Sequence, residues 1–421
     1  MQPHLNSQSV LVIPSWYPPR GGTFFRDHAS ALALTGMKVS VISLDLISLK
    51  KDPGLLLRGA HISSAFDQGV SEYRSPCPII PLMEKPNANL WIRKMKQLAL
   101  QFIEKHGRPD VIQAHSSIWA GVAAASVKKQ TGIPYVLTEH RGRFVNPNPQ
   151  AAAFFRSWHQ PLIGEAFANA SKIVVVSDAL KEKIAGIAGV AEDDILTIPN
   201  LTDTDFFHPR PGSRPPGTFT FFSLAHLVPE KGMHTLISAA GMLQQQKLDF
   251  QVIIGGDGTE GASLKKAVRD ASLNEVIRFT GRLSREKVRE WLHQAHAFVL
   301  PSHFEAFGVV LIEAMACGLP AISTRSGGPQ HIINDQTGIL VDPGDPCALA
   351  KAMHNMIDGN AGYDRARIRK YATERFSPGV VAARYAALYE EVTGKMPSAA
   401  KNKAGGKRSN EPGPPNYLKP E

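Results

Sequence analysis

The fold is decided by one stretch of the sequence, residues 303–320, which reads His303-Phe304-Glu305-Ala306-Phe307-Gly308-Val309-Val310-Leu311-Ile312-Glu313-Ala314-Met315-Ala316-Cys317-Gly318-Leu319-Pro320. It follows an apolar run over residues 297–301, which predicts a buried strand, and it opens a helix that ends at Gly318 and Pro320. The stretch is therefore a strand-to-helix turn in an α/β sheet. Ligands bind at such turns because free backbone N–H groups and the positive end of the helix dipole face the space beyond the strand.

Two carboxylates flank this turn, Glu305 just before the helix and Glu313 inside it. Their separation along a helix is about 12 Å. That distance allows one carboxylate to contact a sugar while the other contacts a ribose across a diphosphate, so the spacing fits a nucleotide-sugar. Two glutamates at this spacing are by themselves more often solvated helix charges. The whole string, which includes Phe307, Gly308 and residues 314–320, is far more specific.

The string Glu-Ala-Phe-Gly-x4-Glu-Ala-Met-Ala-Cys-Gly-Leu-Pro, residues 305–320, resembles the signature of retaining glycosyltransferase family 4, within the glycogen-synthase-like group 1 superfamily. The resemblance extends over about residues 10–392. It implies the GT-B fold, which is an α/β fold with two Rossmann-like parallel-sheet domains facing across a cleft. It also implies an enzyme, a hexosyltransferase that uses a nucleotide-sugar.

Length and composition favour two domains and a soluble protein. The chain has 421 residues, too many for one core, and 43% of them are apolar. No apolar run reaches about 18 residues, the length that a membrane-spanning helix needs. The N-terminus lacks the basic region of a signal peptide, so we expect a cytoplasmic protein. The three cysteines, Cys77, Cys317 and Cys347, follow no metal-ligand spacing, which predicts reduced thiols.

The formal net charge is +10, part of it in a Pro/Gly/Ser/Asn-rich basic tail, residues 396–421, that we expect to be disordered. The other charges are spread along the chain without a recognisable nucleic-acid module, so we expect no nucleic acid partner. Residues 89–105 predict an amphipathic helix with Arg93, Lys94 and Lys96 near Trp91. Such a helix either rests on an anionic membrane or, more often, packs its apolar face on the sheet. A peripheral location at the inner face of the membrane therefore stays open.

Strands and helices alternate along residues 1–208, which predicts a parallel sheet in an N-terminal acceptor-binding domain. We expect strands at residues 9–15 and 38–44, with a helix at residues 24–35 between them. The loop before this helix contains Gly21 and Gly22, and such a pair in the family lets the backbone approach the donor phosphates or the acceptor. A tight turn that needs positive φ explains either glycine nearly as well. Residues 46–89 predict irregular structure with peripheral strands.

Two histidines end predicted strands of this domain, His115 after residues 109–114 and His140 after residues 133–139. Sites are built at these strand ends in α/β folds. The family places a histidine at the end of the second strand, so the resemblance implies that His140 contacts the transferred sugar or its surroundings. His115 is the weaker candidate, for which a structural role is the better interpretation.

The segment between the domains contains Asp203-Thr204-Asp205, the Asp-x-Asp form that binds a divalent ion in glycosyltransferases of another fold. Residues 198–209 resemble instead the interdomain turn of family 4, so we expect no metal here. The proline-rich residues 209–217 predict a hinge about which the cleft closes.

The second, nucleotide-sugar-binding domain is expected over residues 209–375, followed by a helix over residues 376–395 that crosses back to the first domain, as in the family. The loop after residues 218–225 resembles the family's phosphate loop, in which an arginine and a lysine neutralise the diphosphate. Lys231 matches the lysine, but His226 stands in place of the arginine. An imidazole is mostly neutral at pH 7, so we expect activity that is retained but sensitive to pH.

The resemblance assigns a role to each remaining site residue. Glu305 holds sugar hydroxyls, Glu313 the ribose hydroxyls, and Leu283 the base. The implied catalytic residues are His140, Lys231 and Glu305. The implied donor-binding residues are Gly21, Gly22, His226, Gly256, Leu283, Ala306, Phe307, Gly308 and Glu313.

These expectations describe a retaining enzyme that moves a hexose or N-acetylhexosamine from a nucleotide-sugar to a hydroxyl of a glycan or lipid-linked acceptor, with UDP favoured over GDP as the nucleotide. Polysaccharide or glycoconjugate biosynthesis is the expected setting, with the nucleotide-sugar as a co-substrate and without a cofactor or a metal. The alternative is a catalytically silent nucleotide-sugar-binding subunit of a glycan-assembly complex, which the histidine at position 226 motivates. An epimerase of the same architecture is disfavoured, because such epimerases lack the Glu-x7-Glu string.

Overall fold

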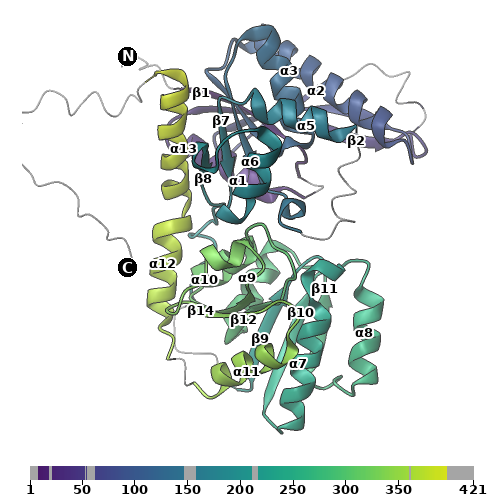
Figure 1. Cartoon of the computed structure of the whole chain (residues 1–421), viewed down its shortest axis with the longest axis vertical. Helices are drawn as coiled ribbons and strands as arrows, with labels where there is room; N and C mark the ends of the chain where they lie inside the picture. The colour runs from purple at the N-terminus through teal and green to yellow at the C-terminus, as the bar shows by residue number, and fades with distance from the viewer. Residues whose placement is uncertain are drawn as a thin grey trace, which may run out of the picture.

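The computed structural model describes residues 8–18, 21–52, 54, 62–146, 158–210, 217–359 and 362–395. Their strands form two sheets, each within its own α/β domain, and Figure 1 shows the two domains stacked one above the other. The prediction of two parallel-sheet α/β domains is confirmed. The predicted tail, residues 396–421, and residues 211–216 of the predicted hinge lie outside the described residues.

The first sheet has eight strands in the order β3-β4-β2-β1-β5-β6-β7-β8. All neighbouring strands are parallel except β3 and β4, which form an antiparallel pair at one edge. The strands are β1 (Ser9–Pro14), β2 (Lys38–Ser48), β3 (Ser63–Asp67), β4 (Val70–Ile79), β5 (Val111–His115), β6 (Tyr135–Glu139), β7 (Lys172–Val175) and β8 (Ile195–Thr197). The α-helices of this domain are α1 (Thr23–Leu34), α2 (Glu84–His106), α3 (Val122–Thr131), α5 (His159–Ala168) and α6 (Lys181–Ala188).

The second sheet has six parallel strands in the order β11-β10-β9-β12-β13-β14. The strands are β9 (Phe219–Leu224), β10 (Phe250–Gly255), β11 (Ile277–Gly281), β12 (Ala297–Leu300), β13 (Ala321–Thr324) and β14 (Gly338–Val341). The α-helices that follow β9 are α7 (Met233–Gln245), α8 (Gly261–Asp270), α9 (Arg285–Gln294), α10 (Val309–Ala316), α11 (Pro346–Ile357), α12 (Arg365–Phe376) and α13 (Pro378–Thr393). Helices cover both faces of a parallel sheet, which is why β12 is an uninterrupted buried apolar run.

The region before α2 is more regular than the sequence predicts. Strand β4 is ten residues long and pairs with β2 along its whole length, although it contains Pro76 and Pro78. The antiparallel partner β3 pairs only with residues 70–74 of β4. The prolines therefore lie where β4 has a single partner, and their missing N–H groups leave no ladder bond unmade.

Helix α2 packs its apolar face on the sheet, which is one of the two alternatives left open by the sequence. It begins at Glu84, earlier than predicted, and it buries an apolar face that consists of Ala88, Trp91, Met95, Leu98, Ala99 and Phe102. All of them except Ala88 belong to the hydrophobic core that includes the strands of the first domain. The apolar face of α2 packs on the protein and is not available to lie in a bilayer.

After the second sheet, the described part of the chain returns to the first domain. Helices α12 and α13 form a column along one side of both domains (Figure 1). The Tyr389 hydroxyl donates to Gln113 Oε1 at 2.7 Å, and the Tyr385 hydroxyl lies 3.1 Å from Thr138 Oγ1. Both tyrosines are buried, so α13 completes the core of a domain whose sheet ended at Thr197.

Candidate active site

The turn between β12 and α10 is held by hydrogen bonds of its backbone. The Glu305 N–H donates to the Ser326 carbonyl at 3.0 Å, and the Glu305 carbonyl accepts from the Gly328 N–H at 2.7 Å. Gly308 precedes the first residue of α10 with φ 101°, a conformation that L side chains rarely adopt. The turn therefore places Glu305 three residues before Gly308, the N-cap residue of α10.

The structure brings Lys231 and Glu305 together. Lys231 Nζ lies 2.5 Å from Glu305 Oε2, and the two side chains are only 23% and 15% exposed. The loop that carries Lys231 is fixed to the β12–α10 turn, because the His303 N–H donates to the Glu230 carbonyl at 2.8 Å. If residue 232 had a Cβ, this atom would lie only 2.0 Å from the Pro301 carbonyl oxygen. The backbones of the two loops are therefore in close contact. A cation and a carboxylate predicted from separate motifs thus form one ion pair.

His226 and Gly256 lie side by side at the neighbouring strand ends. The His226 side chain is 66% exposed, and its Nδ1 lies 3.9 Å from Asp257 Oδ1. Gly256 has φ 117°, and a Cβ there would lie 1.9 Å from the Ala225 carbonyl oxygen. Close backbone packing therefore requires glycine at position 256 without any ligand. Leu283 packs over the preceding residue, Gly255.

Glu313 lies at the domain boundary, where its electrostatic neighbours are Arg285 and Asp27. Burial raises the pKa of the Glu313 carboxyl to about 8, Arg285 opposes this rise, and Asp27 adds to it. Arg285 Nη2 lies 3.1 Å from Asp27 Oδ2, which joins α9 of the second domain to α1 of the first. Burial also raises the pKa of Asp27. This cross-domain ion pair was not predicted from the sequence.

Positions 22 and 21 differ in how strictly the structure requires glycine there. Gly22 precedes α1 with φ 77°, and a Cβ there would lie 2.8 Å from the Trp16 carbonyl oxygen. Gly21 has φ 87°, and the nearest atom to an added Cβ among the described residues outside its chain neighbours is Trp16 Cδ1 at 3.8 Å. The close approach explains Gly22, whereas at Gly21 the positive φ is what favours glycine.

His140 follows β6 and is engaged within its own domain. His140 Nδ1 lies 3.0 Å from Asn200 Oδ1, and its Nε2 lies 3.0 Å from His115 Nδ1. Burial lowers the pKa of His140 to about 3, so the ring is neutral. The loop after His140 reaches the second domain, since a Cβ on Gly142 would lie 3.6 Å from the Ala306 nitrogen. His140 therefore stands next to the central motif, but both of its ring nitrogens already have partners.

Ala306 and Phe307 complete the contact between the domains. The Ser177 hydroxyl donates to the Ala306 carbonyl at 2.6 Å, and both Ala306 and Phe307 are 3% exposed. The Phe307 ring packs against Phe376 at the end of α12, with ring centroids 5.9 Å apart. The central motif therefore serves as an interdomain contact as well as a turn.

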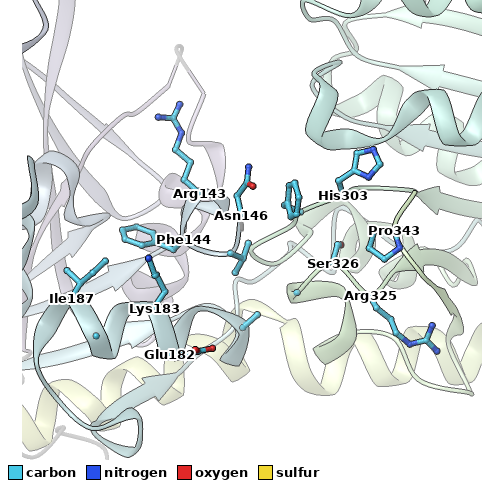
Figure 2. A pocket seen from close by; sticks show the side chains of 15 residues that line it. Arg143, Phe144, Asn146, Glu182, Lys183, Ile187, His303, Arg325, Ser326 and Pro343 are labelled. Atoms are coloured by element: carbon cyan, nitrogen blue, oxygen red, sulfur yellow. The ribbon is translucent and has the colours of Figure 1, made fainter. Parts of the chain in front are cut away.

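A cavity of about 940 Å³ opens between the domains beside this motif (Figure 2). Arg143, Asn146 and Lys183 line it from the first domain, and His303 and Ser326 line it from the second. Lys231 and Glu305 do not line it, but His303 and Phe304 lead directly into Glu305. The residues of the second domain that line the cavity follow the ends of β12, β13 and β14.

Asp203 acts as a turn cap. Its Oδ1 accepts from the N–H groups of Asp205 and Phe206 at 3.1 and 3.0 Å. In the part of the chain that the structure describes, no three or more His, Cys, Asp or Glu side chains are grouped so as to hold a metal ion. A search of the same residues finds no helix with both the length and the apolar character needed to cross a membrane.

Two family models match the chain. The model described as Glycosyltransferase Family 4 matches residues 21–206, and the model described as Glycosyl transferases group 1 matches residues 205–375. The two matches meet between β8 and β9, where the chain passes from one sheet to the other.

Relatives of known activity match most of the chain. A 2-deoxystreptamine N-acetyl-D-glucosaminyltransferase of Niallia circulans is 29% identical over 69% of this chain and 79% of its own length. A glycogen synthase of Mycobacterium tuberculosis is 30% identical over 68% of this chain and 70% of its own length.

Solved structures match the fold of both domains. The sucrose-phosphate synthase of Thermosynechococcus elongatus superposes with a TM-score of 0.75 at 21% identity, over 92% of this chain and 99% of its own. Anabaena HepE, solved with UDP, superposes with a TM-score of 0.69 at 19% identity, over 91% of this chain and 100% of its own.

Proposed function

The chain belongs to glycosyltransferase family 4, and from this premise we propose that it transfers a hexose or N-acetylhexosamine from a UDP-sugar with retention of configuration. It is a glycosyltransferase with the GT-B fold, and its donor is a nucleotide-sugar. UDP is favoured over GDP because Anabaena HepE has been solved with UDP and with UDP-glucose. The observation that carries the proposal is the Lys231–Glu305 pair at the N-terminus of α10.

Lys231 and the N-terminus of α10 act on the leaving group. As the bond between the anomeric carbon and the β-phosphate oxygen breaks, negative charge grows on the diphosphate. A fixed cation and a helix dipole stabilise that charge without reorganising, which lowers the barrier. We therefore propose that the reaction uses no metal. The acceptor oxygen attacks the same face of the sugar, and its proton passes to the departing β-phosphate oxygen, so charge and atoms balance.

Glu305 and Glu313 position the two ends of the donor. Glu305 accepts from hydroxyls of the transferred sugar, and in the unliganded protein Lys231 occupies that acceptor. Glu313 accepts from the ribose hydroxyls, with Leu283 and the backbone near Gly256 beside the base. The donor thus lies along the strand ends from β11 to β12, and the 940 Å³ cavity beyond Glu305 receives the acceptor.

The acceptor is a glycan or a lipid-linked glycan, and we propose a cytoplasmic protein that meets the membrane at its inner face. Since α2 buries its apolar face, the contact falls on the turn before it. Leu82 there is 102% exposed, Met83 is 46% exposed, and Lys85 follows. An exposed apolar side chain beside a lysine suits an anionic bilayer. Co-sedimentation with phosphatidylglycerol vesicles, lost in Leu82→Asp, is the expected result.

A panel of UDP- and GDP-sugars tests the function directly. We expect one donor to bind and to be hydrolysed slowly, and we expect Glu305→Ala to lower that rate about a hundredfold. NMR of the first product gives the anomeric configuration, and an inverted product would overturn retention. A donor that binds without turnover would support instead a silent binding subunit, the alternative that the exposed histidine at position 226 motivates.

His226→Arg is expected to raise kcat about tenfold. A guanidinium is always charged and presents two parallel N–H donors to a phosphate, which suits a diphosphate leaving group. His226→Gln, a neutral hydrogen-bond donor, serves as control and should not raise kcat. An unchanged kcat in His226→Arg would exclude His226 from the diphosphate site.

Donor binding at pH 7 is expected to release about one proton more in the wild type than in Glu313→Gln. The raised pKa of about 8 means that Glu313 holds its proton in the unliganded protein. Ribose hydroxyls that donate to the carboxylate favour its ionised form, so binding lowers the pKa. Affinity for UDP-glucose should accordingly rise as pH increases towards 8. Calorimetry in buffers of different ionisation enthalpy counts the protons, and an equal count in both proteins would contradict the ribose contact.

A further inference from the structure

Three histidines lie in contact, and two of them, His28 and His115, are buried. The three are His28 on α1, His115 at the end of β5, and His140 after β6. The ring centroid of His115 lies 4.9 Å from the ring centroid of His28 and 5.1 Å from that of His140. His28 is 6% exposed and His115 is 1% exposed. We refer to this group as the histidine cluster.

Two hydrogen bonds determine where the protons of the cluster lie. An amide oxygen only accepts, so Asn200 Oδ1, at 3.0 Å, requires a hydrogen on His140 Nδ1. The neutral His140 ring then has a lone pair on Nε2, which accepts from His115 Nδ1–H at 3.0 Å. His115 Nε2 is left as a buried lone pair, and within the described part of the chain it has no hydrogen-bond partner.

This chain of bonds reaches the segment between the domains. Asn200 belongs to that segment, and two residues later the Thr202 N–H donates to the Phe376 carbonyl at the end of α12, at 2.9 Å. On the other side, His140 leads into Arg141 and Gly142, the loop that meets Ala306. Arg141 is held in turn by its Nη2, which donates to the Ile118 carbonyl at 2.9 Å. A shift of the interdomain segment therefore reaches the loop through the His140 ring.

We propose that His115 and Asn200 are positioning residues that hold His140 in its Nδ1–H tautomer and so couple the interdomain segment to the loop facing the donor motif. Neither residue touches the sugar. The proposal rests on the transferase function proposed above for its effect on rate, but the tautomer itself is a property of the unliganded protein. Burial lowers the pKa of all three histidines, which agrees with neutral rings.

The tautomer is measured by long-range ¹H–¹⁵N correlation spectra of the histidine side chains in the unliganded, full-length protein. His140 is assigned by comparison with His140→Gln. We expect an Nδ1–H signal for His140 in the wild type from pH 6 to pH 8. An Nε2–H tautomer, or an equal mixture of the two, would overturn the proposal whether or not a donor has been found.

Two pairs of variants separate positioning from packing. His115→Phe keeps a ring beside Phe25 but removes the donor, whereas His115→Asn keeps an N–H near the position of Nδ1. Asn200→Leu removes the acceptor, whereas Asn200→Asp keeps it. We expect His115→Phe and Asn200→Leu to give mixed tautomers and a kcat lowered about tenfold to a hundredfold, with KM for the donor within about twofold.

The conservative variants should behave like the wild type. His115→Asn and Asn200→Asp are expected to keep the Nδ1–H tautomer and a kcat within about threefold of the wild type. His28→Leu is the control, because His28 belongs to the cluster but bonds to neither His140 nor Asn200. Equal losses in His115→Phe and His115→Asn would assign His115 to packing alone. A changed tautomer without a change in kcat would refute the coupling.

Discussion

Lys231→Met is expected to lower kcat about a hundredfold to a thousandfold, because in the proposed reaction it removes the cation that stabilises the leaving diphosphate. The phosphate loop has His226 where the family has an arginine, so Lys231 carries most of the positive charge of the loop. KM for the donor should change less than kcat, since the interaction strengthens only as charge develops. Initial rates of sugar transfer or donor hydrolysis measure the effect.

Two controls accompany this variant. Lys231→Arg keeps the charge and should retain a kcat within about tenfold of the wild type. Lys266→Met removes a lysine of the same domain whose exposed side chain pairs with Asp270, and it should leave kcat unchanged. A Lys231→Met enzyme as fast as the Lys266→Met control would remove Lys231 from the mechanism.

Lys231→Met also leaves the Glu305 carboxylate, which is 15% exposed, without its partner. The kcat of the double variant Lys231→Met/Glu305→Gln should therefore lie within about threefold of the kcat of Lys231→Met alone, because the pair acts as one unit. If the loss of kcat in the double variant equalled the product of the two single losses, the two side chains would act independently.

Gly256→Ala is expected to lower the melting temperature of the second domain by about 10 °C, which corresponds to roughly 4 kcal/mol of unfolding free energy. The residue has φ 117°, and the new Cβ would lie 1.9 Å from the Ala225 carbonyl oxygen. Backbone cannot yield as a flexible side chain does, so strands β9 and β10 must separate where the donor binds. Circular dichroism and donor titration should report the loss of stability and of binding together.

Gly241→Ala is the matched control for this substitution. Gly241 lies inside α7 of the same domain, and its added Cβ would meet Leu273 Cδ1 at an ordinary 3.8 Å. Alanine is the better helix former by about 0.5–1 kcal/mol, so the melting temperature should rise slightly. If both variants melted like the wild type, the close approach at position 256 would be wrong.

The parts of the fold that the sequence predicts are those with local signals. The β12–α10 turn could be located because its apolar strand, glycine and helix stop follow one another within residues 297–320. Strand β4 was expected to be irregular because proline is disfavoured in ladders, and only the short reach of β3 explains why Pro76 and Pro78 are tolerated. The start of α2 was placed late, since residues 84–88 carry no strong capping signal.

The sequence predicts those residues of the candidate site that lie in recognisable motifs, but not the pairs that form between distant residues. Lys231 and Glu305 come from two separate motifs, and the structure places them in contact. The Asp27–Arg285 pair joins residues 258 positions apart, and neither has a local pattern that announces a partner. His115 was identified as a strand-end histidine, but its bond to His140 depends on the strand order β5-β6, which composition and periodicity do not specify.

The return of α13 to the first domain has a consequence for synthesis on the ribosome. The last strand of the first sheet ends at Thr197, but the helix that covers its core begins only at Pro378, about 180 residues later. At about 5–20 residues per second, that interval lasts roughly 10 to 40 s. During this time the nascent first domain lacks the tyrosines that bond to Gln113 and Thr138, and the second domain can fold before the first is complete. A message truncated before α13 would therefore yield a finished second domain joined to an open, protease-sensitive first domain.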